Sequence, residues 1–267
     1  MELFSLKDKV AIVTGACGLL GTQHCGALAA AGANVVVADL EERACEVVAG
    51  RLPGRPLAVG MDVTSMDSLQ AARERILEVY GRIDVLVNNA AINDMFENPA
   101  LARHQSMFEH YPLDVWDRSW KVNVSGVFLC SQILGRVMAE QGSGSIINIA
   151  STYGIVAPDQ SIYRNEEGEQ TFYKSPAYPV TKSAVLGFTK FLAAYWGHKG
   201  VRVNALSPGG VENRQDAFFQ TNYSKKTLLG RMAAPADYKG AIVFLASDAS
   251  AYMTGANLVV DGGWTAI

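Results

Sequence analysis

Short apolar runs rich in β-branched residues recur along the chain, and stretches with helical periodicity separate them. Seven runs predict strands, at residues 10–14, 34–39, 56–61, 83–88, 145–149, 201–206 and 257–260. Several are apolar throughout, as expected for strands buried on both faces. The intervening helices are predicted to include residues 21–31, 65–80, 116–141 and 183–196. This alternation predicts an α/β fold, with a doubly wound, seven-stranded parallel sheet flanked by helices on both faces.

Two long polar segments interrupt the alternation, at residues 93–113 and 153–175. Each follows a predicted strand, and open α/β sheets bind ligands beyond the carboxyl ends of their strands. We expect both segments, together with residues 209–230, to shape a substrate pocket; surface decoration is the alternative. Because no linker, repeat or low-complexity tract divides residues 1–267, we expect a single domain.

Composition narrows the class of protein. The 267 residues are 49% hydrophobic and 18% charged, which is typical of a globular chain. A net charge of −3 without a basic cluster argues against a nucleic-acid partner. Four scattered cysteines predict a reduced, cytoplasmic protein without a metal site. The amino terminus lacks the apolar region of a signal peptide, and no apolar run approaches the length of a membrane span.

Two tyrosines are followed by a lysine four residues later, in the pairs Tyr178 with Lys182 and Tyr195 with Lys199. An ammonium beside a phenol favours the phenolate, and we expect it to lower the pKa of the tyrosine for proton transfer. Prolines next to Tyr178 fit a helix that begins there, at the ligand edge of the sheet. Tyr195 would lie about 25 Å further along that helix, at the opposite edge. The first pair is therefore the predicted functional one.

A glycine-rich turn follows the first predicted strand and opens a helix, with glycines at positions 15, 18 and 21. Such glycines let the backbone approach a pyrophosphate, which the helix amino terminus stabilises. Asp39 ends the second predicted strand, where a carboxylate binds ribose hydroxyls and repels a 2′-phosphate. No basic residue lies in the turn or directly after Asp39. This predicts NAD(H) in preference to NADP(H), although Asp39 could instead cap a helix.

Further polar residues end the next two strands at the same edge. Asp62 and Val63 follow the third strand, and the run Asn88-Asn89-Ala90-Ala91 ends the fourth. Asp62 could accept a hydrogen bond from the adenine amino group. Asn88 could serve the ligand or bond the backbone across the strand ends.

Together, these motifs resemble the short-chain dehydrogenase/reductase family, in its compact, single-domain branch with a Rossmann fold. The resemblance spans about residues 6 to 263 and rests on the glycine turn together with Asn88-Asn89-Ala90, Asn123, Ser151, Tyr178-Pro-Val-Thr-Lys182, Ser207-Pro208-Gly209 and Asp261-Gly262-Gly263. It implies a nicotinamide cofactor held by Gly15, Cys17, Gly18, Leu19, Leu20, Gly21, Asp39, Leu40, Asp62, Val63, Asn89, Ala90, Ala91, Tyr178, Lys182, Pro208, Gly209, Val211 and Asn213.

The resemblance also implies how the catalytic residues act. Tyr178 is the general acid/base, and Lys182 lowers its pKa and binds the nicotinamide ribose. Ser151 orients the substrate, and Asn123 holds a water that passes protons to Lys182. On the residues alone, Ser151 could equally serve a turn, and Asn123 a helix kink or a buried structural amide.

Three departures from the family pattern stand out. Leu19 occupies a place where the branch usually has glycine, and Asn213 one where a threonine often contacts the nicotinamide carboxamide. Ser151 and Tyr178 are 27 positions apart, about twice the usual family separation, and the polar loop 155–175 fills the difference.

The loops predict a polar substrate. Their hydrogen-bonding and charged residues are Asn93, Asp94, Arg103, His104, Arg164, Asn165, Lys174, Arg214 and Gln215. We expect a sugar or sugar phosphate, and basic residues in the loops could bind a phosphate or carboxylate. Residues 158–175 and 207–215 also resemble oxidoreductases of bacterial surface-sugar and nonulosonic-acid synthesis. His104 and His110 are expected to be solvated loop histidines rather than metal ligands.

The expected reaction is the interconversion of a secondary alcohol and a ketone. The alternatives are a dehydratase or epimerase that retains NAD, and a non-catalytic cofactor sensor. Residues 185–196 are apolar or small nearly all round, and with residues 256–264 they resemble the family's subunit contacts. This predicts a homo-oligomer, a tetramer or a dimer, although Trp264 could instead complete the core.

Overall fold

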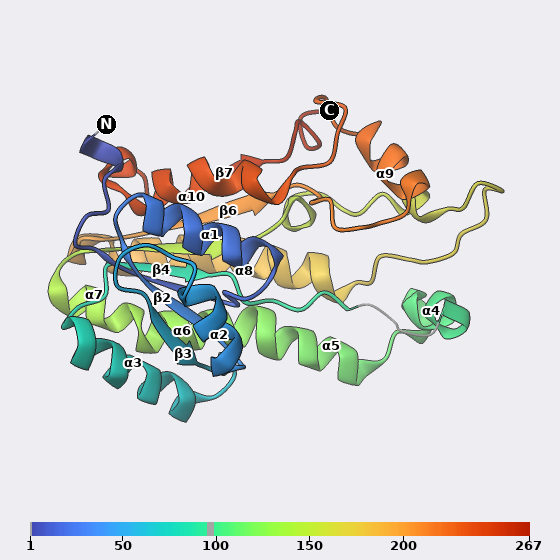
Figure 1. Ribbon diagram of the computed structural model, residues 1–267. Helices are drawn as coiled ribbons and strands as arrows, with labels where there is room; N and C mark the ends of the chain where they lie inside the picture. The colour runs from blue at the N-terminus through green and yellow to red at the C-terminus, as the bar shows by residue number, and fades with distance from the viewer. Residues whose placement is uncertain (1, 95–98) are drawn as a thin grey trace.

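Seven parallel strands form the central sheet of the computed structural model, which describes residues 2–94 and 99–267 (Figure 1). The strands are β1 (Val10–Thr14), β2 (Asn34–Asp39), β3 (Leu57–Gly60), β4 (Val85–Asn88), β5 (Gly144–Ile149), β6 (Val201–Pro208) and β7 (Asn257–Val260). Their order is β3-β2-β1-β4-β5-β6-β7, so the winding direction reverses between β1 and β4. The predicted doubly wound sheet is confirmed. Ligands of such folds bind beside this reversal point.

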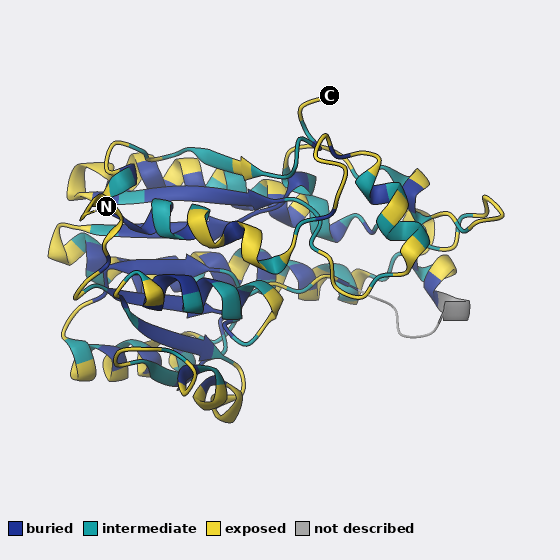
Figure 2. Ribbon diagram, turned by 45° about the horizontal axis from the view of Figure 1, so that its top comes forward, coloured by how far each residue is buried: buried dark blue, intermediate teal, exposed yellow. Residues whose placement is uncertain are grey.

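Helices cover both faces of the sheet and bury two apolar cores. One core contains residues of α3 (Met66–Tyr80), α6 (Gly126–Ile133), α7 (Gly135–Gln141) and α8 (Ala177–Trp196). The other contains residues of α1 (Leu19–Ala30), α2 (Glu42–Ala49) and α10 (Lys239–Ala246). Alternate residues of β1 enter the two cores, with Val10 and Ile12 in the first and Ala11 and Val13 in the second. This two-sided burial explains why the strand runs are apolar throughout (Figure 2).

The helix predicted over residues 116–141 begins earlier and is interrupted. It consists of α5 (Leu113–Trp120), a π-helical turn (Lys121–Ser125), α6 and α7. By length and composition alone, Leu113–Gln141 could cross a membrane, but 56% of its most apolar window is buried inside the protein. We therefore interpret it as a core helix. The helix α8 begins at Ala177, one residue before the start at Tyr178 that the neighbouring prolines predict and six before the start of the predicted run 183–196.

The long loops gather at the end of the molecule where the strands have their carboxyl ends. Figure 1 shows α4 (Pro99–Ser106), α9 (Ala217–Ser224) and the loop between β5 and α8 together at this end. Residues 95–98 of the first predicted substrate loop lie outside the described residues. The same end carries the sites described below.

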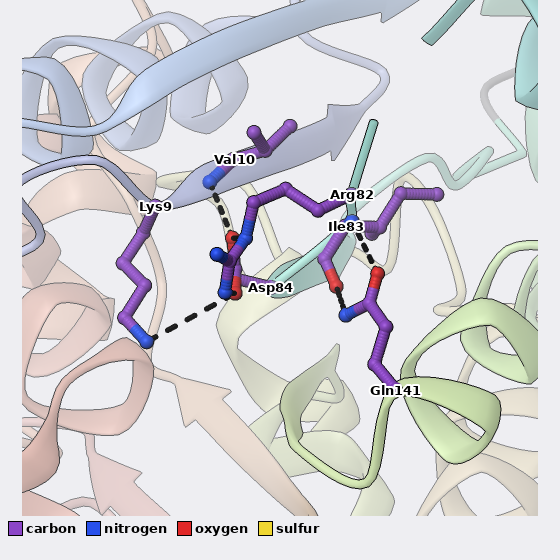
Figure 3. A network of polar contacts seen from close by, with 6 residues as sticks. All are labelled: Lys9, Val10, Arg82, Ile83, Asp84 and Gln141. Atoms are coloured by element: carbon purple, nitrogen blue, oxygen red, sulfur yellow. Dashed lines mark hydrogen bonds and ion pairs between the residues drawn. The ribbon is translucent and has the colours of Figure 1, made fainter. Parts of the chain in front are cut away.

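At the opposite end, a buried carboxylate joins β1 to β4 (Figure 3). Asp84 is 5% exposed and accepts hydrogen bonds from the backbone N–H of Val10 (2.8 Å) and from the Arg82 guanidinium (2.6 and 2.9 Å). The Gln141 amide bonds both backbone groups of Ile83 beside it. These contacts fix the starts of both strands.

Asp84→Ala should lower the free energy of unfolding by about 2–4 kcal/mol, because it leaves a buried N–H and a guanidinium without their partner. Urea denaturation measures this change. Arg136→Ala is the control, since its pair with Glu140 is exposed on both sides, and we expect about 0.5 kcal/mol or less. Equal losses in the two variants would contradict the structural role of Asp84.

Candidate active site

The glycine turn after β1 is packed too closely for side chains. Gly15 has a φ of +61°, and a Cβ there would lie 2.8 Å from the Cα of Ala90. A Cβ at Gly21 would lie 2.2 Å from the Gly15 carbonyl oxygen. The Thr14 hydroxyl accepts hydrogen bonds from the backbone N–H groups of Asn89 and Ala90, both at 3.0 Å. The ends of β1 and β4 are thereby locked together beneath the turn.

A cleft runs over this turn and the ends of β2, β3 and β4. Twelve of the predicted cofactor residues line it: Gly15, Gly18, Leu19, Leu20, Gly21, Asp39, Leu40, Asp62, Val63, Asn89, Ala90 and Ala91. The Asp39 carboxylate accepts hydrogen bonds from the backbone N–H groups of Cys17 (2.9 Å) and Leu40 (2.8 Å), which fix its orientation. No lysine or arginine is found among the described residues that line this cleft. A glycine cradle with a fixed carboxylate fits the pyrophosphate and ribose of a dinucleotide.

A second cleft adjoins the first, and the two share the lining residues Leu20, Asn89, Ala91 and Ile92. The catalytic candidates Ser151, Tyr178 and Lys182 line it, with the predicted cofactor residues Pro208, Gly209 and Val211. All three predicted substrate segments contribute to its wall. Its other polar lining residues include Asn93, Lys174 and Gln215. Sequence reasoning missed its aromatic and apolar wall, which consists of Tyr153, Tyr163, Phe219, Tyr223 and Met232.

Tyr178 is the second residue of α8, and the next turn of the helix brings Lys182 beside it. Burial raises the pKa of Tyr178, while a hydrogen bond with Ser151 works in the opposite direction. The Lys182 ammonium lies 5.7 Å from the centre of the tyrosine ring and donates to the Ile149 carbonyl at 2.7 Å. Burial also lowers the pKa of Lys182 to about 8. The expected net lowering of the tyrosine pKa is therefore wrong for this structure, because desolvation outweighs the hydrogen bond with Ser151.

Ser151 combines the two roles that the sequence left open. Its hydroxyl accepts a hydrogen bond from the backbone N–H of Tyr153 (3.2 Å) and caps the short 3₁₀ helix Thr152–Gly154. The same side chain is hydrogen-bonded to Tyr178. The turn thus holds Ser151 against the tyrosine.

Asn123 lies on the π-helical turn and is 1% exposed. Its amide accepts a hydrogen bond from the backbone N–H of Ile92 (2.8 Å) and donates to the carbonyl of the same residue (2.9 Å) and to Thr181 (3.2 Å). Both structural alternatives, a distorted helix and a buried amide, are therefore present. The proton relay through Asn123 stays a prediction. A role at the site is compatible with the π-helical turn, since such turns are frequent at functional sites.

Asn88 has a structural role. Its amide donates hydrogen bonds to Ser131 (3.1 Å) and to Asn148 (2.8 Å), and it lines neither cleft. It therefore ties β4 to α6 and β5.

Several predicted residues lie outside both clefts. They are the catalytic candidate Asn123, the cofactor candidates Cys17 and Asn213, and the substrate candidates Asp94, Arg103, His104, Arg164, Asn165 and Arg214. The Asn213 side chain is exposed, and its backbone N–H donates to Gln215, which does line the substrate cleft. Tyr195, of the rejected Tyr–Lys pair, is 60% exposed near the far end of α8. His104 and His110 stack on each other, with ring centres 4.0 Å apart.

Known proteins resemble this chain in sequence over nearly its whole length. D-threitol dehydrogenase of Mycolicibacterium smegmatis is 38% identical over 98% of this chain and 95% of its own length. NAD-dependent glycerol dehydrogenase of Listeria innocua is 33% identical, with 98% and 96% covered.

Two solved structures superpose closely. A short-chain type dehydrogenase/reductase from Mycobacterium marinum has a TM-score of 0.85 and 33% identity over 100% of this chain and 98% of its own. A gluconate 5-dehydrogenase from Burkholderia cenocepacia, in complex with NADP and tartrate, has a TM-score of 0.85 and 31% identity over 99% and 98%. Residues 15–265 also match the family model described as enoyl-(acyl carrier protein) reductase. The chain therefore belongs to the short-chain dehydrogenase/reductase family of oxidoreductases.

Proposed function

We propose that this protein is an NAD(H)-dependent oxidoreductase that interconverts a secondary alcohol and a ketone on a polar, sugar-like small molecule. One observation carries the proposal: Tyr178, Ser151 and Lys182 line a single cleft that adjoins the glycine-lined one. The names of two relatives, a threitol and a glycerol dehydrogenase, support a polyol-like substrate and a role in carbohydrate metabolism.

The chain's own residues handle the proton and the charge. When bound, the nicotinamide cofactor supplies or accepts the hydride. The Tyr178 phenol gives a proton to the carbonyl oxygen during reduction, and its phenolate takes the proton of the alcohol during oxidation. Ser151 donates a hydrogen bond to the same oxygen and stabilises the charge that develops on it. Lys182 would donate a hydrogen bond to the nicotinamide ribose.

The preference for NAD(H) rests on Asp39. Its carboxylate lines the nucleotide cleft, where it would accept hydrogen bonds from ribose hydroxyls and repel a 2′-phosphate. The relatives do not decide between the two cofactors, because one is named as NAD-dependent and another was solved with NADP. The preference for NAD(H) is therefore inferred from Asp39 of this chain.

The proposal is tested by following NADH formation from neutral to alkaline pH over polyols, sugars, sugar acids, sugar phosphates and simple alcohols. We expect turnover of hydroxylated compounds with NAD. Much faster turnover of apolar alcohols or ketones would contradict the polar substrate. A cofactor that stays bound through purification, with no net NADH formation, would favour a dehydratase or epimerase.

We also propose a homo-oligomer, because α8 presents a stripe of exposed aromatic rings. Phe191 and Tyr195 are 61% and 60% exposed and stack with ring centres 5.9 Å apart. Phe128 of α6 is 45% exposed and extends the stripe through Phe188. Trp264, in contrast, is 8% exposed and stacks on Tyr223, so it completes a small core.

Phe191→Glu should therefore reduce the molar mass measured by light scattering to that of a smaller assembly, because it places a charge in the stripe. Val47→Glu is the control, since Val47 is 56% exposed on α2, a helix of the other face. A wild-type monomer would overturn the prediction, as would equal effects of the two substitutions.

A further inference from the structure

We propose that Lys174 binds a carboxylate or phosphate group of the substrate, beside the carbon whose oxygen Tyr178 serves. This inference rests on the proposed function and narrows the substrate to an anionic hydroxy compound, such as a sugar acid or a sugar phosphate. Lys174 lies in the long loop between β5 and α8, outside the family motifs quoted above.

Lys174 is placed directly against the catalytic candidate. Its ammonium nitrogen lies 4.5 Å from the centre of the Tyr178 ring and lines the same cleft. Lys182 stands further from the ring, is 3% exposed, and is bound to the carbonyl of Ile149. Of the two lysines beside Tyr178, Lys174 is thus the partly exposed one.

The loop holds Lys174 in position through its backbone. The Gln160 side chain accepts a hydrogen bond from the Lys174 N–H (2.8 Å) and donates one to its carbonyl (3.1 Å). The neighbouring N–H of Tyr173 donates to Ser106 of α4 at 3.0 Å. A site whose backbone is fixed in this way loses little conformational entropy when a ligand binds.

The cleft offers Lys174 no carboxylate. Among its described lining residues, the acidic types Asp and Glu are absent, and the two lysines are the charged side chains. The ammonium donates one hydrogen bond to Asn93, and an ammonium has three N–H groups in total. Two donors therefore remain for a ligand, and hydrogen bonds between charged partners are about twice as strong as neutral ones.

Burial lowers the pKa of Lys174 to about 8, although Asp94 works in the opposite direction. One carboxylate oxygen of Asp94 accepts a hydrogen bond from Tyr111 (2.8 Å), the other has no hydrogen-bond partner among the described residues, and Asp94 lines neither cleft. The charge of Lys174 is thus incompletely compensated by the protein. An anionic group of a ligand would supply the negative charge that balances the Lys174 ammonium.

A set of matched three-carbon compounds separates the ligand classes: glycerol, glycerate and glycerol 3-phosphate, with glucose, gluconate and 6-phosphogluconate as a larger set. Their binding to the NADH-loaded protein is measured by calorimetry. We expect at least one anionic member to bind about 10-fold tighter than its neutral partner, a difference of about 1.4 kcal/mol. A gain for the carboxylates alone or for the phosphates alone identifies the anion.

Lys174→Met should weaken binding of the preferred anion about 10- to 100-fold and leave neutral compounds unchanged. Lys174→Arg should restore part of the affinity. The matched control is Lys190→Met, because Lys190 is exposed on α8. If the neutral compounds bind as tightly as the anions, or if Lys174→Met leaves anion binding unchanged, the inference is overturned.

Turnover of the same compounds is measured in parallel. A binding residue acts on KM, whereas a lysine that only tunes Tyr178 would lower kcat on neutral and anionic substrates alike, which would overturn the inference. The proposed redox reaction and the proposed anion site at Lys174 can also fail separately. Selective, Lys174-dependent anion binding without any redox turnover would contradict the proposed reaction and leave the anion site standing.

The affinity for the anion should fall above about pH 8 in the wild type and stay level in Lys174→Met, because the ammonium loses its proton near its pKa of about 8. The other titratable groups around it are Tyr178 and Lys182 on α8, Asp94 after β4, Tyr153 and Tyr163 in the loop, and Tyr223 on α9. Burial also lowers the pKa of Lys182 to about 8. A loss of anion affinity above this pH is therefore assigned to Lys174 only if it is absent in Lys174→Met.

Discussion

Tyr178→Phe is expected to reduce kcat/KM by about 10³-fold or more in both reaction directions, because general acid/base groups contribute about 10²–10⁴-fold. The phenyl ring keeps the packing of the first turn of α8, so the fold and the affinity for NADH should change little. Steady-state kinetics measure kcat/KM in both directions, and a titration with NADH measures the affinity for the cofactor.

Tyr195→Phe is the control for this substitution. Tyr195 has a lysine at the same spacing but is exposed near the far end of the helix, and we expect its variant to be fully active. The pH dependence gives an independent reading. Since burial raises the pKa of Tyr178, the phenolate is scarce at neutral pH, and oxidation should accelerate as the pH rises, while reduction, which needs the phenol, should stay level until the pH approaches that raised pKa. Activity of Tyr178→Phe within tenfold of wild type would exclude the assigned role.

The sheet and the cofactor edge follow from the sequence because their signals are local. A strand buried on both faces must be apolar throughout, and position 15 must be glycine because a Cβ there would lie 2.8 Å from the Cα of Ala90, just after β4. Asp39 ends β2 and lines the nucleotide cleft for the same reason, since its position depends only on where that strand ends.

The substrate wall has no such local signal. Tyr153 and Tyr223 are 70 positions apart, yet both pack against Trp264, and no periodicity links the three. The position of Lys174 over Tyr178 similarly depends on the two hydrogen bonds between its backbone and the Gln160 side chain, within an irregular loop. The direction of the Tyr178 pKa was mispredicted because spacing reveals a neighbouring charge but not the depth of burial.

Asp39→Asn is expected to shift the ratio of kcat/KM for NADH over NADPH about 100-fold toward NADPH. A hydrogen bond from a ribose hydroxyl to a charged group contributes about 1.5–3 kcal/mol, so NADH should lose at least about tenfold. Removing a carboxylate close to a 2′-phosphate relieves a repulsion of about 1–4 kcal/mol, so NADPH should gain by a similar factor. Initial rates with each cofactor at saturating substrate measure the ratio.

The asparagine keeps the shape and one acceptor oxygen of Asp39, so the substitution tests its charge more than its fold. The carboxylate also fixes the turn through the Cys17 N–H at 2.9 Å, and thermal unfolding shows whether that contact survives. Asp67→Asn, which removes the same charge from an exposed position on α3, should leave the ratio unchanged. If the wild type prefers NADPH, or if the two variants shift the ratio equally, then Asp39 does not select the cofactor. A shifted ratio with unchanged thermal stability would assign the selection to a single negative charge at the end of β2.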